Sequence, residues 1–420
     1  LWQAFVTSDC RLYRPTDGVA REMGFLSRFS WRLLRRVSPR LLLKAGRLWL
    51  IPGLRSLSRF RKRVAASELF PPFFFLSLTD ACNLRCHGCW ITSQGQPRQV
   101  SRDDVNHFIA QAKVHGNRFF VLLGGEPFLY KDLWTILRQN RDCYFQIITN
   151  ALLLDEAAVA TAKEVGNATI LVSLDGFESA NDARRGQGTF QAIKEAFQRL
   201  RKGKILFGVA TTITSENYEA ALSPEYVNWV DEQGAIYLWY YIYRPVGPDP
   251  MPQLALSRAD ILKVRRQLLR LRRISPILIV DTYWDADGKA VCPAALGLGY
   301  HIGPAGDIEL CPPLSFARET IRDHGGDVFH TINTSDFLRG FQKFALSRTR
   351  GCPILECPHE LEAFLREHHA RDTSGRDAFA ELRASSPRAS HHIPGEELPE
   401  TMGTYRWLKK HLFFGLGAYG

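Results

Sequence analysis

Three cysteines, Cys82, Cys86 and Cys89, lie on one short stretch of the chain with the spacing C-x3-C-x2-C. Three thiolates on one loop can bind three irons of a cubane iron–sulfur cluster and leave the fourth iron open. An open iron can take a substrate or a cofactor as its ligand, which an electron carrier with four cysteine ligands does not need. We therefore expect these residues to be the catalytic ligands of a 4Fe–4S cluster; buried structural cysteines are the alternative.

A second set of cysteines lies further along the chain and consists of Cys292, Cys311, Cys352 and Cys357. Cysteines bunched in this way favour metal ligation over a disulfide framework and indicate a reducing cytosol. Four thiolates suit zinc as well as an iron–sulfur cluster, so both remain open. Cys10 and Cys143 stand alone, and we expect each to be a buried apolar residue without a chemical role.

Apolar runs that alternate with helical stretches predict the scaffold for these cysteines. We expect strands at residues 73–78, 119–123, 144–149, 169–174, 207–212 and 236–243, and helices at 102–114, 131–138, 156–165, 190–201, 225–233 and 258–271. Six β-then-α units in series imply parallel strands with right-handed crossovers. Six units suit a partial barrel better than a closed one of eight, and its chemistry belongs at the C-terminal ends of the strands. Cys82 follows the first strand directly, at such an end.

Polar motifs follow the later strands. They are Gly124-Gly125-Glu126-Pro127, Thr149-Asn150, Ser173-Leu174-Asp175, Arg184-Arg185 and Thr211-Thr212. With the cysteine loop, these motifs resemble the radical S-adenosylmethionine superfamily over residues 70–275. The resemblance implies that residues 124–127 meet the methionyl amino group of S-adenosylmethionine. It also implies cofactor contacts for Asn150, Ser173, Asp175, Arg185 and Thr212. Read without the resemblance, Ser173 could cap a helix and the arginines could be solvated surface charges.

One position departs from the pattern of the family. An aromatic residue that packs near the adenine usually precedes the third cysteine, and here that position is Gly88. The departure leaves the cluster ligands in place but puts the adenine contact in doubt. The resemblance implies reductive cleavage of S-adenosylmethionine to a 5′-deoxyadenosyl radical, which abstracts hydrogen from an unactivated carbon. The cofactor carries this chemistry, and the protein orients it and excludes water. A reductant such as flavodoxin or ferredoxin is the implied partner.

The second cysteine set has its own resemblance. Gly306 and Cys311 form G-x4-C, and Cys352 and Cys357 form C-x4-C, as in the SPASM or twitch extension of the same superfamily. That extension holds auxiliary iron–sulfur clusters, and a full SPASM domain brings more cysteines than occur here. One auxiliary 4Fe–4S cluster with four ligands is the simplest assignment. Zinc is the alternative.

The positive charge of the chain is concentrated near its N-terminus. The formal net charge is +11, and twelve Lys and Arg residues but no acidic residue lie between Glu22 and Glu68. Trp, Phe and Leu residues alternate with these basic residues, which is typical of helices that lie in a membrane interface. A helical arm packed on the domain is the alternative. Nucleic acid is not expected, because the apolar share is high for a phosphate-binding arm. We expect Pro39 and Pro52 to break the arm into short helices.

The sequence thus predicts an α/β fold, a partial (β/α)6 TIM-like barrel with a small iron–sulfur extension. The expected domains are a basic amphipathic arm at 1–68, the barrel at 69–275, the auxiliary cluster domain at 276–360 and a tail at 361–420. The sequence has no secretory signal and no run of 18 apolar residues, so we expect a cytoplasmic protein, with peripheral binding at the inner face of the membrane as an option.

Three functions are weighed. The arm favours a lipid-linked or membrane-associated substrate. A peptide maturase is the alternative, weakened because residues 1–68 lack the alternation of a peptide-clasping domain. A non-catalytic metal protein that binds a partner is the third, and the motif at residues 124–127 argues against it.

Overall fold

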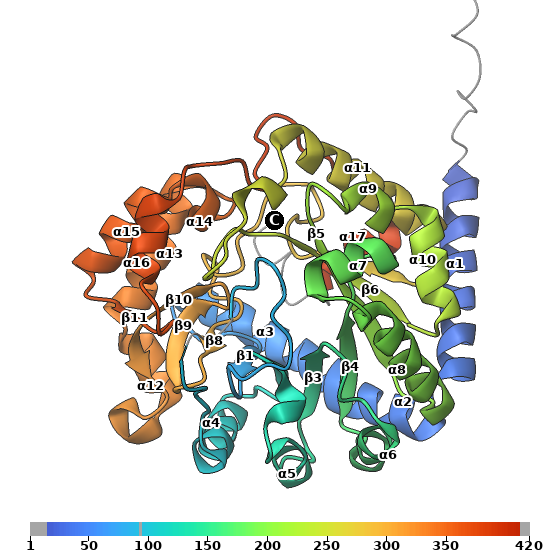
Figure 1. Ribbon diagram of the computed structural model, residues 1–420, viewed down its shortest axis with the longest axis horizontal. Coiled ribbons are helices and arrows are strands. Elements are labelled where there is room, and N and C mark those ends of the chain that lie inside the picture. Colours follow the sequence, from blue (N-terminus) through green and yellow to red (C-terminus); the bar gives the residue numbers. More distant parts are fainter. Residues whose placement is uncertain (1–14, 92–94, 412–420) are drawn as a thin grey trace, which may run out of the picture.

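The computed structural model describes residues 15–91 and 95–411, and side chains from Gly24 onward. Cys10 and residues 412–420 of the predicted tail lie outside the described residues. In the described part, eleven strands form one sheet in the order β11-β10-β9-β8-β1-β2-β3-β4-β5-β6-β7. Helices cover the outer face of this curved sheet (Figure 1).

The centre of the sheet is the predicted partial barrel. Its strands are β1 (Phe74–Ser77), β2 (Phe119–Leu123), β3 (Tyr144–Thr149), β4 (Ala168–Ser173), β5 (Phe207–Ile213) and β6 (Tyr237–Ile242). Its helices are α4 (Arg102–Val114), α5 (Leu133–Gln139), α6 (Glu156–Val165), α7 (Glu178–Arg185), α8 (Thr189–Gly203), α9 (Tyr218–Ala221), α10 (Pro224–Glu232) and α11 (Arg258–Ile274). Consecutive strands pair in parallel throughout. The predicted six β/α units are confirmed.

Later segments extend this sheet at both edges. On one edge β7 (Leu278–Val280) pairs in parallel with β6, and on the other β8 (His301–Ile302) pairs in parallel with β1. Antiparallel strands β9 (Asp307–Cys311), β10 (Leu314–Thr320) and β11 (Arg371–Asp372) follow from β8. The remaining helices are α12 (Val328–Thr334), α13 (Asp336–Arg348), α14 (Pro353–Glu356), α15 (Pro358–Glu367), α16 (Ala378–Ala384) and α17 (Gly403–His411). The segment after residue 276 therefore shares the sheet of the barrel, and the domain boundaries stay a prediction.

The N-terminal arm is helical from α1 (Pro15–Arg36) through α2 (Pro39–Ala45), a π-helical turn η1 (Gly46–Leu50) and α3 (Ile51–Ala65). Pro39 begins α2, but the prediction that Pro52 breaks the arm is wrong. Pro52 lies in the first turn of α3, directly after the π-helical turn. A wider π turn rearranges the backbone hydrogen bonds locally, so a residue without an N–H is tolerated there.

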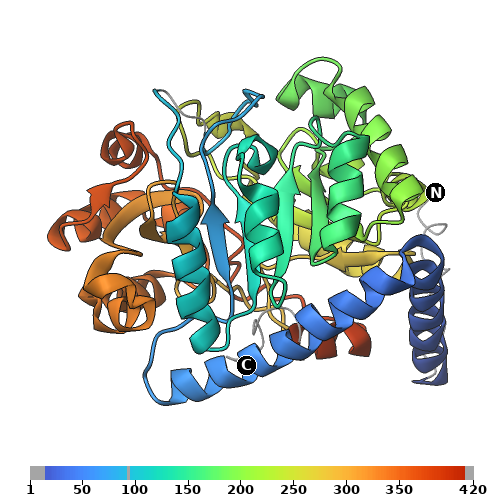
Figure 2. The ribbon, with the colours of Figure 1, turned by 90° about the horizontal axis from the view of Figure 1, so that it is seen from below.

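The arm closes the N-terminal end of the barrel. Lys44 Nζ donates to the carbonyl of Val165 (2.6 Å), and Ser38 N–H donates to the carbonyl of Lys204 (3.0 Å). Ser56 Oγ donates to Asn117 Oδ1 (3.2 Å). These partners immediately precede β4, β5 and β2, so α2 and α3 lie across the starts of the strands (Figure 2). The C-terminal strand ends, where the chemistry is expected, point away from the arm.

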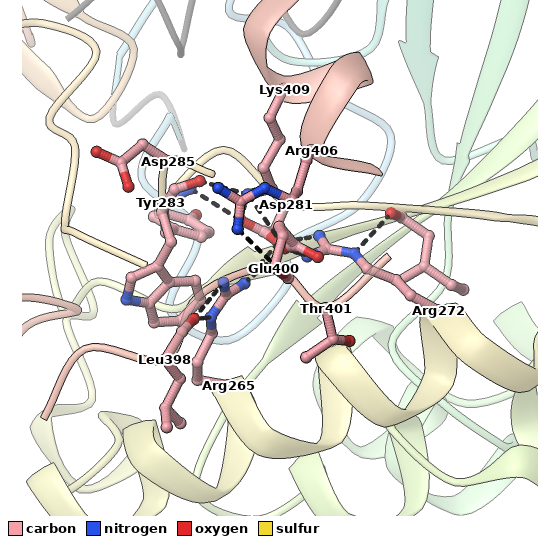
Figure 3. Close-up of polar contacts among 12 residues, drawn as sticks. Arg265, Arg272, Asp281, Tyr283, Asp285, Leu398, Glu400, Thr401, Arg406 and Lys409 are labelled. Carbon is pink, nitrogen blue, oxygen red and sulfur yellow. Dashed lines mark hydrogen bonds and ion pairs between the residues drawn. The ribbon is translucent and has the colours of Figure 1, made fainter. Parts of the chain in front are cut away.

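A buried network of charges fastens the C-terminal segment to the barrel (Figure 3). Arg265 and Arg272 of α11 both pair with Glu400, and Arg272 also pairs with Asp281, just after β7. Lys409 of α17 donates to Asp281 Oδ1 (3.1 Å). Three cations thus surround two carboxylates, and all five side chains are buried. Because an unpaired buried charge is costly, the network holds the tail in one position.

Candidate functional site

A cavity of about 360 Å³ opens among the C-terminal strand ends. Both cysteine sets lie on its wall, with Cys82, Cys86 and Cys89 from the loop after β1 and Cys292, Cys311 and Cys352 from the later segments. Cys357 is buried but does not line the cavity. The structure therefore brings six of the seven predicted metal ligands to one space.

Gly124 and Gly125 hold the loop that leads to the cysteines. The N–H of Gly125 donates to the carbonyl of Thr79 (2.9 Å), and the N–H of Glu126 donates to the carbonyl of Ala81 (2.7 Å). A Cβ at Gly124 would collide with the first carbonyl and one at Gly125 with the second. Gly124 also has φ +121°, which disfavours other residues. Both glycines also line the cavity. Because they have no side chains, the backbone of the cysteine loop can lie close against them.

Glu126 acts from behind the cavity wall. Its buried carboxylate accepts hydrogen bonds from Thr149 Oγ1 (2.8 Å) and the N–H groups of Asn150 (2.8 Å) and Phe128 (3.1 Å). Burial raises the pKa of Glu126 to about 7, although these three donors oppose the shift. The carboxylate thereby fixes Asn150, whose side-chain amide lies 3.8 Å from Cys82 Sγ. Glu126 and its neighbour Pro127 do not line the cavity, whereas Asn150 does.

Asp175 holds two arginines at the cavity wall. Its Oδ2 lies 2.6 Å from Nη1 of Arg184 and 2.8 Å from Nε of Arg185, and its Oδ1 accepts the N–H of Thr212 (2.8 Å). Burial alone would raise the pKa of Asp175, but the charges of Arg185 and Arg184 outweigh it and lower the pKa to about 2. The carboxylate is fully buried, and Ser173, Thr212 and both arginines line the cavity. Asp175 thus orients Arg184, Arg185 and Thr212 at the cavity wall.

Tyr243, directly after β6, belongs to a motif that follows the sixth predicted strand, but the sequence assigned it no role. A side chain at Gly88 would collide with the hydroxyl and ring of Tyr243, and Gly88 has φ +65°. The Tyr243 hydroxyl donates to the carbonyl of Pro250 (2.6 Å), which fixes the ring, and Arg184 lies 6.0 Å from its centroid. An aromatic ring therefore does lie beside the cysteine loop, supplied by a distant strand. The motif at residues 243–247 after the sixth predicted strand was a sequence signal for this place, but no spacing in the sequence pairs Tyr243 with Gly88.

The second thiol set has a cation in its midst. Arg244 Nε donates to Cys352 Sγ (3.1 Å), and burial raises the pKa of Cys292 to about 11. Burial likewise raises the pKa of Cys311 well above its ordinary value, opposed by the charge of Arg244. Burial also raises the pKa of Cys82 to about 11. Thiols in so apolar a setting stay protonated unless a metal takes them as thiolates.

The residues present fit iron–sulfur clusters. The eight described cysteines are free thiols, and six of them line the cavity in two groups of three. Within residues 15–91 and 95–411, no group of three or more His, Cys, Asp or Glu side chains has the geometry of a single-ion site. Cys143 is buried in the core, as predicted, and does not line the cavity.

A buried chain of hydrogen bonds joins the barrel to its extension beside the third cysteine. His301 Nε2 lies 2.6 Å from Ser77 Oγ, and its Nδ1 lies 2.6 Å from Glu309 Oε2. The ring of Trp90, directly after Cys89, packs edge-on against His301 at 5.7 Å. This chain links β1, β8 and β9, and so fixes the second thiol set relative to the first.

The structure thus combines a partial β/α barrel with three thiols after its first strand, and these thiols face a cavity at the strand ends. Residues 76–222 match the model of the radical SAM superfamily. Over these residues the chain carries a domain of the radical S-adenosylmethionine superfamily.

Several curated proteins are similar to the chain. An AdoMet-dependent heme synthase of Methanosarcina barkeri is 28% identical over 50% of this chain and 62% of its own length. A pre-heme d1 synthase of Dinoroseobacter shibae is 28% identical over 53% and 60%. The sporulation killing factor maturation protein SkfB of Bacillus subtilis is 28% identical over 34% and 36%. The chain thus spans less than two thirds of the length of these relatives.

Solved structures share the fold. Streptococcus suis SuiB bound to S-adenosylmethionine has a TM-score of 0.58 at 18% identity, over 70% of this chain and 72% of SuiB. The anSMEcpe protein with bound AdoMet and the Cp18Cys peptide has a TM-score of 0.52 at 18% identity, over 64% and 82%.

Proposed function

We propose that this enzyme cleaves S-adenosylmethionine reductively and uses the resulting radical to abstract hydrogen from a substrate carbon in the shared cavity. The observation that carries the proposal is the single cavity of about 360 Å³ walled by Cys82, Cys86 and Cys89 on one side and the second thiol set on the other. The bound cluster and S-adenosylmethionine would supply the electron transfer and the 5′-deoxyadenosyl radical, with the electron drawn from an external reductant.

The residues of the chain hold the cofactor and exclude water. Cys82, Cys86 and Cys89 would bind the cluster. Gly124, Gly125, Asn150, Ser173, Arg185 and Thr212 line the cavity and are the candidate contacts to S-adenosylmethionine. Glu126, with Pro127 beside it, and Asp175 hold these groups in place from behind through Asn150 and the arginines. The arginines can bind a carboxylate, and the glycines leave the backbone accessible to an ammonium group.

Product analysis tests this proposal. The protein with a reconstituted cluster is reduced with dithionite in the presence of S-adenosylmethionine, and 5′-deoxyadenosine is measured. Cys86→Ala should abolish its formation, because one of three cluster ligands is lost. Cys143→Ala should leave it unchanged, because Cys143 lies in the core away from the cavity. A wild-type protein with a full cluster that forms no 5′-deoxyadenosine would contradict the proposal.

The second thiol set is proposed to hold an auxiliary 4Fe–4S cluster through Cys292, Cys311 and Cys352. Cys357, the predicted fourth ligand, interacts with Cys352 from outside the cavity wall. Three thiolates on the wall would leave an iron facing the cavity, in contrast to the closed cluster that the four-cysteine count suggests. Metal analysis separates this proposal from the zinc alternative, since about eight irons per chain are expected for two clusters and about four irons with one zinc for the other.

The cavity is chemically suited to an apolar substrate with an acidic group. Aromatic side chains such as Phe73, Trp239 and Tyr241 line it, together with Arg184 and Arg244. Apolar walls with a few placed cations favour such a substrate. The heme synthases and the peptide-maturing protein among the relatives act on different molecules, and we propose the chemical class only.

We propose that the N-terminal arm binds a membrane surface. This proposal does not concern how the substrate reaches the cavity. Trp31, Leu34 and Leu43 are 65%, 65% and 74% exposed in the stretch that lacks acidic residues. Among the described residues no helix could cross a membrane. Exposed apolar and basic side chains together favour an anionic lipid surface. Because the arm covers the starts of the strands, it would tether the enzyme with the cavity facing away from the lipid.

Co-sedimentation with phosphatidylglycerol vesicles tests the tether. Wild-type protein should sediment with them at low salt and less at high salt, and the triple variant W31A/L34A/L43A should remain in solution. Val114→Ala, which removes an equally exposed apolar side chain outside the arm, should behave as wild type. Wild-type protein that does not bind these vesicles at low salt would rule the tether out.

A further inference from the structure

Arg244 occupies a position that neither the barrel nor the cysteine spacing requires. It lies two residues after the end of β6, lines the cavity and donates its Nε–H to Cys352 Sγ at 3.1 Å. Its guanidinium lies 5.4 Å from the centroid of the Tyr283 ring. That ring is fixed in turn, because the Tyr283 hydroxyl accepts the N–H of Ile242 (2.9 Å). The cation is therefore held firmly against the second thiol set.

The surroundings of Arg244 leave its charge free to act on sulfur. In the described part of the chain its contacts are the Cys352 thiol, the Tyr283 ring and, at 3.5 Å, the carbonyl of Ile242. Its charge also acts on Cys311. The arginines beside the first thiol set differ, because Arg184 and Arg185 are paired with the buried carboxylate of Asp175. The two cluster sites thus differ in local charge.

We propose that Arg244 is a positioning residue that raises the reduction potential of the cluster held by Cys292, Cys311 and Cys352. The inference rests on the proposed auxiliary cluster. Reduction adds a negative charge to a cluster, and a nearby cation stabilises the reduced form. A hydrogen bond to a ligand sulfur acts in the same direction. Arg244 supplies both effects from one side chain.

Redox titration of the reconstituted holoenzyme, followed by electron paramagnetic resonance, tests the proposal. In Arg244→Gln the midpoint potential of the auxiliary cluster should fall by about 59 mV or more, which is tenfold in a one-electron equilibrium. The midpoint of the first cluster should not move. Arg244→Lys keeps the charge but loses the planar Nε donor. Its auxiliary cluster should have a midpoint potential between those of wild type and Arg244→Gln. Arg258→Gln removes an exposed arginine that pairs with Glu396 and should match wild type.

Each outcome decides the matter. An Arg244→Gln variant with both clusters and unchanged midpoints overturns the role of Arg244 and leaves the auxiliary cluster standing. A wild-type protein that holds only one cluster overturns both the role of Arg244 and the auxiliary cluster. The formation of 5′-deoxyadenosine would still test the first cluster and the proposed cleavage of S-adenosylmethionine. If Arg244→Gln loses the auxiliary cluster, the lysine variant carries the test, and a midpoint at or above that of wild type overturns the proposal.

Discussion

The ring of Tyr243 fills the space beside Gly88 that any larger residue at that position would need. Tyr243 directly follows β6, and Gly88 lies between the last two cysteines of the cluster loop. The aromatic ring beside the cluster loop therefore comes from the residue after β6 and not from position 88. Packing between the loop and the end of β6 fixes the loop against the barrel.

Gly88→Ala should reduce cluster binding. The new Cβ collides with the fixed Tyr243 ring, and a non-glycine residue in the left-handed region costs about 1–2 kcal/mol. We expect a lower iron content per chain and weaker absorbance of the first cluster, with the fold intact by circular dichroism. Gly53→Ala is the matched control, because a Cβ there meets nothing within 4 Å. Full cluster occupancy in Gly88→Ala would show that the loop tolerates displacement of Tyr243.

The auxiliary ligands can be distinguished one by one. Cys352→Ala should remove the iron of one cluster and leave the other, because Cys352 lies on the cavity wall and bonds to Arg244. Cys357→Ala should retain both clusters, because Cys357 does not reach the wall. Iron and sulfide analysis of the two variants, beside Cys143→Ala, measures this. Loss of four irons in Cys357→Ala would restore the four-ligand assignment.

Much of the scaffold could be predicted because its physical signals are local. Residues 102–114, 119–123, 144–149 and 156–165 form the predicted elements with the predicted bounds. Each is an apolar run or an amphipathic period between turn residues or helix caps, such as Ser101 and Asp155. Pro52 was misjudged because the π-helical turn that accommodates it has no composition signal of its own.

The site could be predicted only in part because its remaining relations join distant segments. The cysteines and strand-end motifs could be recognised in order along the chain. Three relations depend on how β6 and the extension pack together. Tyr243 lies beside Gly88, Arg244 lies beside Cys352, and Cys357 lies off the cavity wall. No spacing within the sequence encodes those distances. The side on which the arm lies also follows from tertiary contacts such as Lys44 with Val165.

The buried network around Glu400 should respond asymmetrically to mutation. Glu400→Gln leaves three buried cations with one carboxylate, and we expect a loss of about 3–5 kcal/mol in the free energy of unfolding. Lys409→Met leaves two cations with two carboxylates, so its cost should be smaller. Urea denaturation of both variants measures the difference. An equal loss would mean that hydrogen bonding, such as that of Lys409 to Trp284, outweighs the charge balance.

Glu126 should make stability depend on pH in the weakly acidic range. Burial raises its pKa from 4.5 to about 7, so between these values the folded protein holds a proton that the unfolded chain has lost. The contribution of Glu126 therefore favours folding below pH 4.5 and is lost as pH rises through 7, by about 3 kcal/mol. We expect the change in unfolding free energy between pH 4.5 and 8 to differ by this amount between wild type and Glu126→Gln, measured by urea denaturation. Glu178→Gln, at an exposed position, should follow wild type. Parallel profiles for all three proteins would show that the donors from Thr149 and Asn150 keep the Glu126 carboxylate charged throughout this range.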